Sequence, residues 1–315
     1  MERCIFHIFI HNFAAAKRNR NIAYMEAKTV TRKLQWGKSI ASFLLVLFTM
    51  PLGHAMMILM EHNMTPTALH YAAFAMGFVG LAVTIAGVFV KGDTRQTLFG
   101  LFGGLLFWTG WVEFLFKYFA DRFGVQPLIE NGEVVTKPEY LILPASFGFF
   151  MMFAMIYLFS TRTGCNFFNW LQQHLLGDRR NDIVARPMTR HSAIVTFEEL
   201  NMILWASYLL LMFLYDKEFV GDHHPLTMLV GACCLGGSVL IFRKQLRLST
   251  WGANIRMAIP TVIVFWTPVE ILGRLNFFKE IWVHPMQHAP EMLAILVAFI
   301  GVGLYMVWAA RHKTE

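Results

Sequence analysis

The chain has 315 residues, of which 56% are hydrophobic and only 15% are charged, and its formal net charge at pH 7 is +7. A soluble domain of this length normally carries far more charge, so the composition excludes an ordinary water-soluble enzyme or binding module. The basic charge requires no nucleic-acid partner, because an excess of Lys and Arg is typical of membrane-protein loops that face anionic lipid.

The first 38 residues are basic and are predicted to form a tail on the cytoplasmic side. Their apolar stretch, residues 5–13, is too short to cross a bilayer as a helix. Met25 begins a more ordinary start of a protein, Met-Glu-Ala-Lys. Two interpretations stay open, a true start at Met25 or a basic tail that begins at Met1, and neither gives the segment a functional role.

Eight apolar stretches follow the tail, and each is long enough to cross a hydrocarbon core of about 30 Å as an α-helix. We expect membrane spans over residues 39–60, 67–90, 96–120, 139–161, 197–215, 225–242, 256–273 and 289–310. None of them shows the short alternating pattern of membrane-barrel strands. The sequence therefore predicts an all-α polytopic helix bundle that has the lipid bilayer as its main partner.

Two connections between spans are predicted to have structure of their own. Residues 121–138 contain Asn131 and Gly132 between short β-prone runs, which predicts a small hairpin. Residues 162–196 form the longest connection on the other side of the membrane. They begin with an amphipathic stretch, 166–176, followed by Gly177, which predicts a helix in the lipid interface.

Basic residues are unevenly divided between the two sides of the membrane. When the connections are assigned to alternate sides, 21 of the 27 Lys and Arg residues fall on the side of the two termini. The positive-inside rule then predicts that both termini are cytoplasmic. The opposite side holds seven of the twelve histidines. We expect outward-facing chemistry, and a bacterial inner membrane, because no organelle-targeting pattern is recognised.

The two halves of the chain share a short motif. The third span contains FWTGWVE at 107–113, and the seventh contains FWTPVE at 265–270, so the copies match with one residue inserted in the first. A Pro-Glu pair opens both the fourth and the eighth span. These matches predict a tandem 4+4 repeat with its pseudo-two-fold axis along the membrane normal. The expected division is a tail 1–38, a first unit 39–161, a connector 162–196, a second unit 197–310 and a tail 311–315.

The motif places one carboxylate inside each of two spans, Glu113 and Glu270. An ionisable group at that depth is costly unless it is paired, hydrated or neutralised. If the repeat brings them face to face, the two carboxylates could share a proton or a metal ion, which makes them the candidate catalytic residues. The structural alternative is an ion pair within each helix, because Lys117 and Arg274 each follow four residues later.

The segment before the eighth span holds the densest cluster of metal-ligand residue types. His284, His288 and Glu291 are spaced i, i+4 and i+7, which would place them on one helix face. Two imidazoles and a carboxylate form the ligand set of many zinc, iron and copper sites, so these three are the candidate metal ligands. Pro290 argues against a continuous helix there, and solvated loop histidines are the alternative.

His54 and His70 are the candidate ligands of a cofactor. His54 lies within the first span and His70 near the predicted outer start of the second. Two histidines from adjacent helices at one depth are what a b-type haem requires. The alternative is a core histidine that is hydrogen-bonded to a neighbour.

These residues support several functions. The leading hypothesis is a protein whose outward His/Glu site binds a transition metal or haem, as a membrane subunit of a redox complex with further membrane or outer-side subunits. The second is a secondary transporter of protons, cations or a small solute that uses Glu113 and Glu270. The third is a metal-dependent enzyme that modifies lipid. The fourth is a structural subunit without a cofactor.

Overall fold

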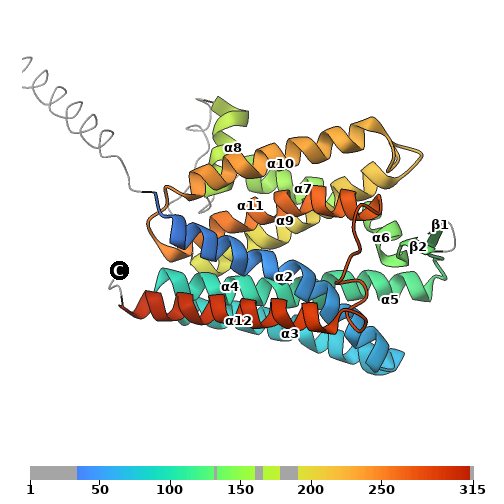
Figure 1. The fold of residues 1–315 in the computed structure, drawn as a ribbon, viewed down its shortest axis with the longest axis horizontal. Coiled ribbons are helices and arrows are strands. Elements are labelled where there is room, and N and C mark those ends of the chain that lie inside the picture. The colour runs from blue at the N-terminus through green and yellow to red at the C-terminus, as the bar shows by residue number, and fades with distance from the viewer. Residues whose placement is uncertain (1–33, 131–132, 160–165, 178–190, 313–315) are drawn as a thin grey trace, which may run out of the picture. The chain divides into compact units, whose positions relative to one another are not determined.

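Each expected membrane span is helical in the computed structural model, which describes residues 34–130, 133–159, 166–177 and 191–312 (Figure 1). Within these ranges eight helical segments are long and apolar enough to cross a membrane. The prediction of an all-α polytopic bundle is confirmed. The described residues from Gln35 onward form one compact unit.

The spans of the two halves follow each other in chain order. The first half contains α2 (Trp36–Asn63), α3 (Pro66–Phe89), a third span made of α4 (Asp93–Phe107), η1 (Trp108–Glu113) and α5 (Phe114–Arg122), and a fourth made of α6 (Pro138–Ile142), η2 (Leu143–Ser146) and α7 (Phe147–Phe159). The second half contains α9 (Ser192–Tyr215), α10 (Pro225–Gln245), α11 (Trp251–Arg274) and α12 (Ala289–His312).

Both connections contain the secondary structure that was predicted for them, and the lipid-interface position of the second stays a prediction. Strands β1 (Leu128–Glu130) and β2 (Glu133–Thr136) pair antiparallel between α5 and α6, although the predicted turn residues 131–132 lie outside the described residues. Helix α8 (Asn166–Leu176) occupies the predicted range and is followed by Gly177, whose φ of 53° suits a glycine at a helix end. Its Trp170 ring is covered by Lys244 of α10 at 3.9 Å.

Several helices begin where the sequence supplies an N-cap. Thr65 accepts a hydrogen bond from the backbone N–H of Ala68 at 3.4 Å at the start of α3, and Thr250 accepts one from Ala253 at 3.4 Å at the start of α11. Pro66 and Pro225 occupy the first positions of α3 and α10, where a missing N–H costs no helical hydrogen bond.

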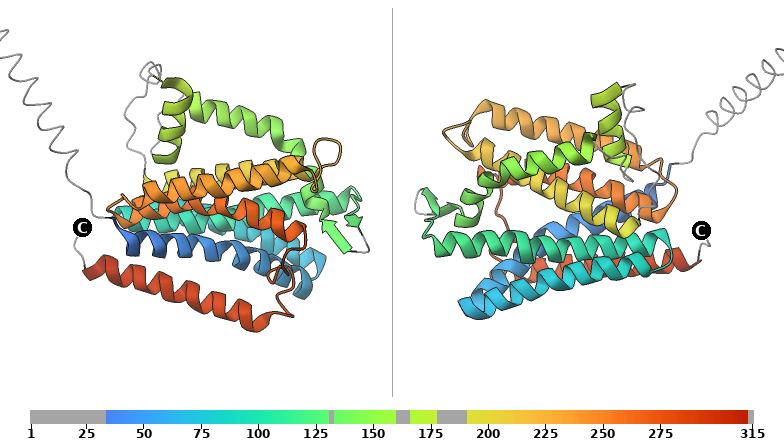
Figure 2. Two further views of the ribbon diagram at one scale, coloured as in Figure 1. Left: turned by 45° about the horizontal axis from the view of Figure 1, so that its top comes forward. Right: turned by 180° about the vertical axis from the view of Figure 1, so that it is seen from behind.

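Helix α11 is the most buried span and α7 the least buried. Helix α11 packs against α10, α2, α9 and α4, whereas α7 and α12 lie at the periphery (Figure 2). The largest hydrophobic cluster fills the space between the central helices, with fully buried Leu45, Leu101, Leu200, Ile255 and Ile259. The core therefore lies where the two halves of the chain meet.

The helix pairings repeat between the halves. The second span packs on the third (α3 on α4) as the sixth packs on the seventh (α10 on α11). The third packs on the fifth (α4 on α9) as the seventh packs on the first (α11 on α2). A pseudo-two-fold axis between the halves would produce this exchange of partners. The tandem repeat, the domain boundaries and the orientation of the termini stay predictions.

The extra residue of the first motif copy falls in a π-helical turn. Residues Trp108–Glu113 form η1, and π-type bonding takes one more residue per turn than the α-helix. The second copy remains α-helical through Glu270, with Pro268 inside the helix. If the two motifs are copies of one repeat, this π turn accommodates the inserted residue.

Candidate functional site

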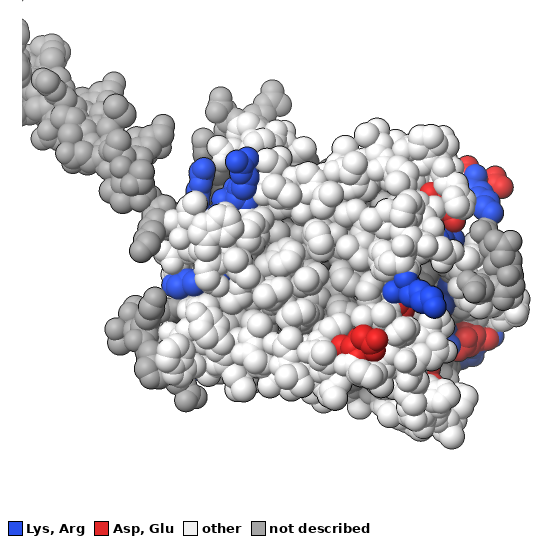
Figure 3. Space-filling model, in the orientation of Figure 1, with Lys and Arg blue, Asp and Glu red and all other residues white. Residues whose placement is uncertain are grey.

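Charged side chains are distributed differently at the two ends of the bundle. The end that carries the hairpin, α5 and α6 is the end that the charge distribution predicts to face outward, and we call it the outer end. The Asp and Glu side chains visible in Figure 3 gather toward this end, whereas Lys and Arg are the charged residues visible at the opposite end. The motif carboxylates belong to the spans whose ends meet here.

Glu113 is the last residue of η1, and its side chain is buried. The hydroxyl of Tyr208 in α9 donates a hydrogen bond to its Oε1 at 3.2 Å. Trp108 is also a close neighbour, but its Nε1 completes no hydrogen bond with a described residue. His54 of α2 and Lys137 are within electrostatic range of the carboxylate. Glu113 is therefore held by a neutral donor and has only distant bases around it.

Two stacked tyrosines lie within electrostatic range of both motif carboxylates. Trp108 and Tyr208 stack with ring centroids 5.6 Å apart, and Tyr208 and Tyr140 stack at 5.6 Å with their planes 8° apart. Both tyrosines are within electrostatic range of Glu113 and of Glu270. The two tyrosines come from α6 and α9. Among the described contacts, the Tyr208 hydroxyl bonds Glu113, whereas Glu270 is bonded by Trp266.

Glu270 repeats the arrangement around Glu113. It is half-buried in α11, and its Oε1 accepts a hydrogen bond from Nε1 of Trp266 at 2.5 Å. Trp266 holds the motif position that Trp108 holds in the first copy. Its ring packs on Trp282, with centroids 4.9 Å apart. In both copies the motif tryptophan is therefore a neighbour of the motif glutamate.

The ion pair expected between Glu113 and Lys117 is not formed among the described side chains. The Lys117 Nζ lies 3.2 Å from Oδ2 of Asp121, a more exposed partner one turn further along α5. Local spacing allowed either partner, and the lysine takes the one nearer to water. The structural alternative for Glu113 is wrong in this form.

The ion pair expected between Glu270 and Arg274 is also replaced. The Nε of Arg274 lies 3.2 Å from Oδ2 of Asp222, and both side chains are less than 10% exposed. The same guanidinium donates to Oγ1 of Thr136 at 2.6 Å and to the carbonyl oxygen of Val135. Arg274 thus joins α11 to the hairpin and to the α9–α10 loop. The described side-chain partner of Glu270 is Trp266.

Glu280 lies in the connection between α11 and α12, beyond the end of the span. Its carboxylate packs directly on Gly273, and a side chain at position 273 would collide with it. Burial and, as a smaller cause, the neighbouring Glu270 carboxylate raise the pKa of Glu280 to about 7. His54 and Arg274 oppose the rise. Glu280 is therefore a carboxyl group that titrates near neutral pH beside the predicted pair.

The candidate metal ligands are only partly brought together. Nδ1 of His288 lies 3.7 Å from Oε1 of Glu291, whose side chain is 53% exposed, and His284 is exposed on the preceding turn. No three His, Cys, Asp or Glu residues form a group able to hold a metal ion in the part of the chain that the structure describes. The metal site of His284, His288 and Glu291 therefore stays a prediction.

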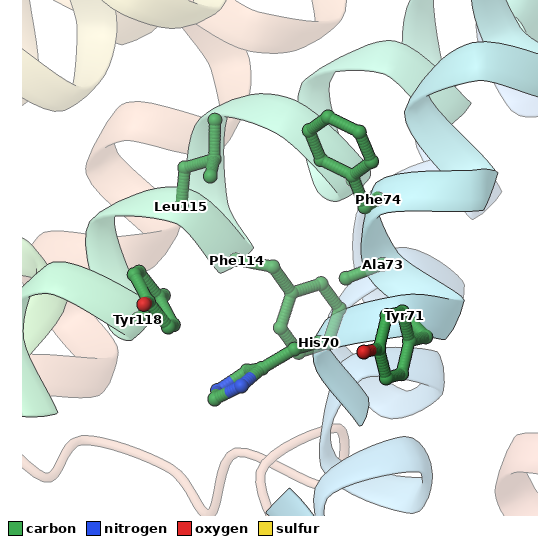
Figure 4. Close-up of a pocket in the computed structure, with 8 residues that line it drawn as sticks. His70, Tyr71, Ala73, Phe74, Phe114, Leu115 and Tyr118 are labelled. Carbon is green, nitrogen blue, oxygen red and sulfur yellow. The ribbon is translucent and has the colours of Figure 1, made fainter. Parts of the chain in front are cut away.

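The two candidate haem ligands make separate contacts. Nδ1 of His54 is 3.3 Å from the carbonyl oxygen of Met50 in its own helix. His70 is exposed on α3, packs edge-on against Tyr118 at 4.7 Å, and borders an apolar pocket beside Phe114 (Figure 4). None of the described contacts joins the two imidazoles, so the haem site stays a prediction.

Sequence analysis did not identify three residues that the structure adds to this region: Tyr140, Tyr208 and Glu280. Tyrosines near the ends of membrane spans are common because their amphipathic rings suit the interface, so neither tyrosine stood out. The position of Glu280 depends on how its loop folds back on α11. Only the Pro-Glu-Tyr start of the fourth span offered a signal for Tyr140.

Comparison with known proteins gives no further guide, because no protein family model, no curated protein and no solved structure matches this chain. A fold alone does not determine a function. The function is therefore argued from the side chains at the outer end.

Proposed function

We propose that the protein is a secondary transporter that carries protons across a bacterial inner membrane, with both termini in the cytoplasm and Glu113 and Glu270 as the proton-carrying groups. One observation carries this proposal. The two carboxylates occupy matching motif positions of the third and seventh spans, and both lie within electrostatic range of the same stacked pair, Tyr140 and Tyr208.

The first supporting argument is the cost of charge inside the bilayer. A carboxylate within a membrane span is unfavourable as an anion unless a cation compensates it. Glu113 is buried, has the Tyr208 hydroxyl as its donor, and forms no ion pair with any base in the described ranges. A bound proton removes this cost, and loss of the proton restores it. This behaviour suits a group that binds a proton and then releases it.

The second argument is the chemistry of the link. A tyrosine hydroxyl donates one hydrogen bond and accepts others, so it passes a proton on without a lasting charge. In this relay Tyr208 gives its proton to Glu113 and takes one from Tyr140, and Tyr140 takes one from protonated Glu270, so Glu113 ends as the acid and Glu270 as the carboxylate. At each tyrosine the O–H bond formed replaces the one broken, and the tyrosine is neutral before and after the exchange.

The third argument is the position of the site. Glu113 and Glu270 lie on α4–α5 and α11, and α4 and α11 pack on each other where the two halves of the chain meet. Transporters built from repeats commonly place their sites at the repeat interface, because a rocking motion of one half exposes the site to either side.

Proton uptake into liposomes that contain the purified protein tests the proposal. We expect proton uptake driven by a membrane potential, which a pH-sensitive dye inside the liposomes measures. Glu113→Gln and Glu270→Gln should each slow it at least about tenfold, which corresponds to roughly 1.4 kcal/mol in the barrier. Glu218→Gln, at an exposed carboxylate of the α9–α10 loop, is the matched control. Wild-type rates in both variants, or no uptake by the wild type, would contradict the proposal.

A metal-binding redox subunit with further partner subunits is the second candidate. The observation that favours it is the 3.7 Å approach of His288 to Glu291, two of its three expected ligands. Elemental analysis and an absorption spectrum of the purified protein test it. Bound metal, or a haem absorption band, that disappears in the His284→Ala/His288→Ala double variant would support this candidate. Metal content that is the same in both proteins would exclude it.

A further inference from the structure

The carboxylate of Glu280 lies directly against Gly273 of α11, and we call this position its seat. A Cβ at position 273 would lie 2.8 Å from Cδ of Glu280, closer than Cβ atoms approach other atoms in proteins, and 3.1 Å from its Cγ, a tight contact. With any side chain at position 273 the Glu280 carboxylate would have to move from this position. The close approach fixes a loop side chain against the last turn of a membrane helix.

This seat places Glu280 beside the proposed transport site. Gly273 lies three residues after Glu270, and residues at that spacing are neighbours on a helix surface. The ionisable groups that face Glu280 come from three helices, and they are Glu270 and Arg274 of α11, His54 of α2 and Tyr215 of α9. Glu280 therefore belongs to the same electrostatic cluster as the motif glutamate.

The surroundings of Glu280 leave its carboxylate available for a proton. Arg274 is the nearest strong base on α11, but it is engaged by the buried Asp222 at 3.2 Å. Glu280 forms no ion pair with a base among the described side chains. Its own side chain is half-buried, whereas Glu113 is buried, so Glu280 is the more accessible of the two to water.

We propose that Glu280, seated on Gly273, is the outer proton acceptor of the transport site and exchanges its proton with Glu270. This inference rests on the proposed function. In the first step an O–H bond of a hydronium ion at the outer surface breaks and the O–H bond of Glu280 forms. In the second, that bond breaks as the O–H bond of Glu270 forms, so the pair carries the same total charge before and after. A pKa of about 7 suits a group that must both take and release protons near neutral pH.

The test compares three variants in the liposome uptake assay over a range of outer pH. Glu280→Gln removes the acceptor. Gly273→Ala leaves the acid in place but displaces it from its seat. Gly301→Ala is the matched control, because a Cβ at this position of α12 meets nothing within 4 Å. In the first two variants we expect proton uptake to be at least about tenfold slower and its rate to depend no longer on outer pH around 7. The control should keep the wild-type rate and pH dependence.

A second measurement does not depend on transport. Infrared titration of the wild type should show a carboxyl band with a midpoint near pH 7, and Glu280→Gln should lack it. Uptake and pH dependence unchanged in Glu280→Gln, with Glu113→Gln inactive, would overturn this inference and leave the proposed function standing. If the wild type shows no uptake, the proposed function fails. An infrared band that is unchanged in Glu280→Gln would show that Glu280 is not the group that titrates near pH 7 and would also overturn this inference.

Discussion

Replacing Arg274 by methionine should destabilise the protein strongly. Arg274 and Asp222 form an ion pair at 3.2 Å with side-chain exposures of 8% and 6%, so the loss of the guanidinium leaves a buried, unpaired carboxylate. Breaking a buried ion pair by removing one partner typically costs about 3–5 kcal/mol. The variant also loses the hydrogen bond to Thr136 at 2.6 Å and the contact with the Tyr215 ring at 4.8 Å.

Lys117→Met is the matched control, because Lys117 holds the corresponding position of the first motif copy. Its ion pair with Asp121 has the same 3.2 Å distance, but the side chains are 23% and 52% exposed. Exposed pairs at i, i+4 contribute only about 0.3–0.5 kcal/mol. The two variants should therefore differ by at least about 2 kcal/mol, and the difference arises from burial.

The free energy of unfolding in mixed detergent micelles measures both effects. In a double-mutant cycle, Asp222→Asn combined with Arg274→Met should be less destabilising than the sum of the two single changes, because the second change removes a partner that is already lost. Equal and small losses for Arg274→Met and Lys117→Met would refute the burial of the Arg274 pair and its role in joining α11 to the hairpin.

Three further predictions follow from other contacts. The pKa of Glu280 is raised from 4.5 to about 7 on folding, so the folded state binds more protons between these pH values and stability falls as pH rises through that window. The melting temperature of Glu280→Gln minus that of the wild type should therefore be larger at pH 8 than at pH 5. A difference in melting temperature that does not change with pH would contradict this. A Cβ at Gly80 would collide with the backbone of α4, so Gly80→Ala should cost roughly 1–3 kcal/mol of unfolding free energy, whereas Gly148→Ala, with nothing within 4 Å, should cost little. Tyr208→Phe removes the 3.2 Å hydrogen bond to Glu113 and should slow proton uptake more than about tenfold. A wild-type rate would exclude the Tyr208 hydroxyl from the path.

The spans were predictable from sequence because apolar length is a property of the chain alone. Their ends were less so. The seventh span was expected to begin at residue 256, yet α11 begins at Trp251 and so also contains Asn254. Asn254 accepts a hydrogen bond from Ser39 of α2 at 2.8 Å. A tertiary partner thus satisfies a polar residue in the first turns of the helix, where hydropathy alone would begin the span later.

The candidate site shows the same division. Glu113 and Glu270 were predictable, because a repeated motif and an ionisable group at membrane depth are both visible in the sequence. Their surroundings were not. The spacing of i+4 favoured Lys117 and Arg274 as partners of the two glutamates. In the structure Glu113 accepts from Tyr208 and Arg274 pairs with Asp222, and both partners come from elements distant in the chain. Local patterns identify the costly residue, and only the fold shows what compensates it.

The central claim is that Glu113 and Glu270 act as one proton-carrying unit linked by Tyr140 and Tyr208. Proton uptake by the Glu113→Gln/Glu270→Gln double variant, compared with each single variant, tests it most directly. Groups that act as a unit show strongly non-additive losses. We predict that the double variant is no slower than the slower single variant. Losses that multiply, or a single variant that keeps the wild-type rate, would contradict a shared site.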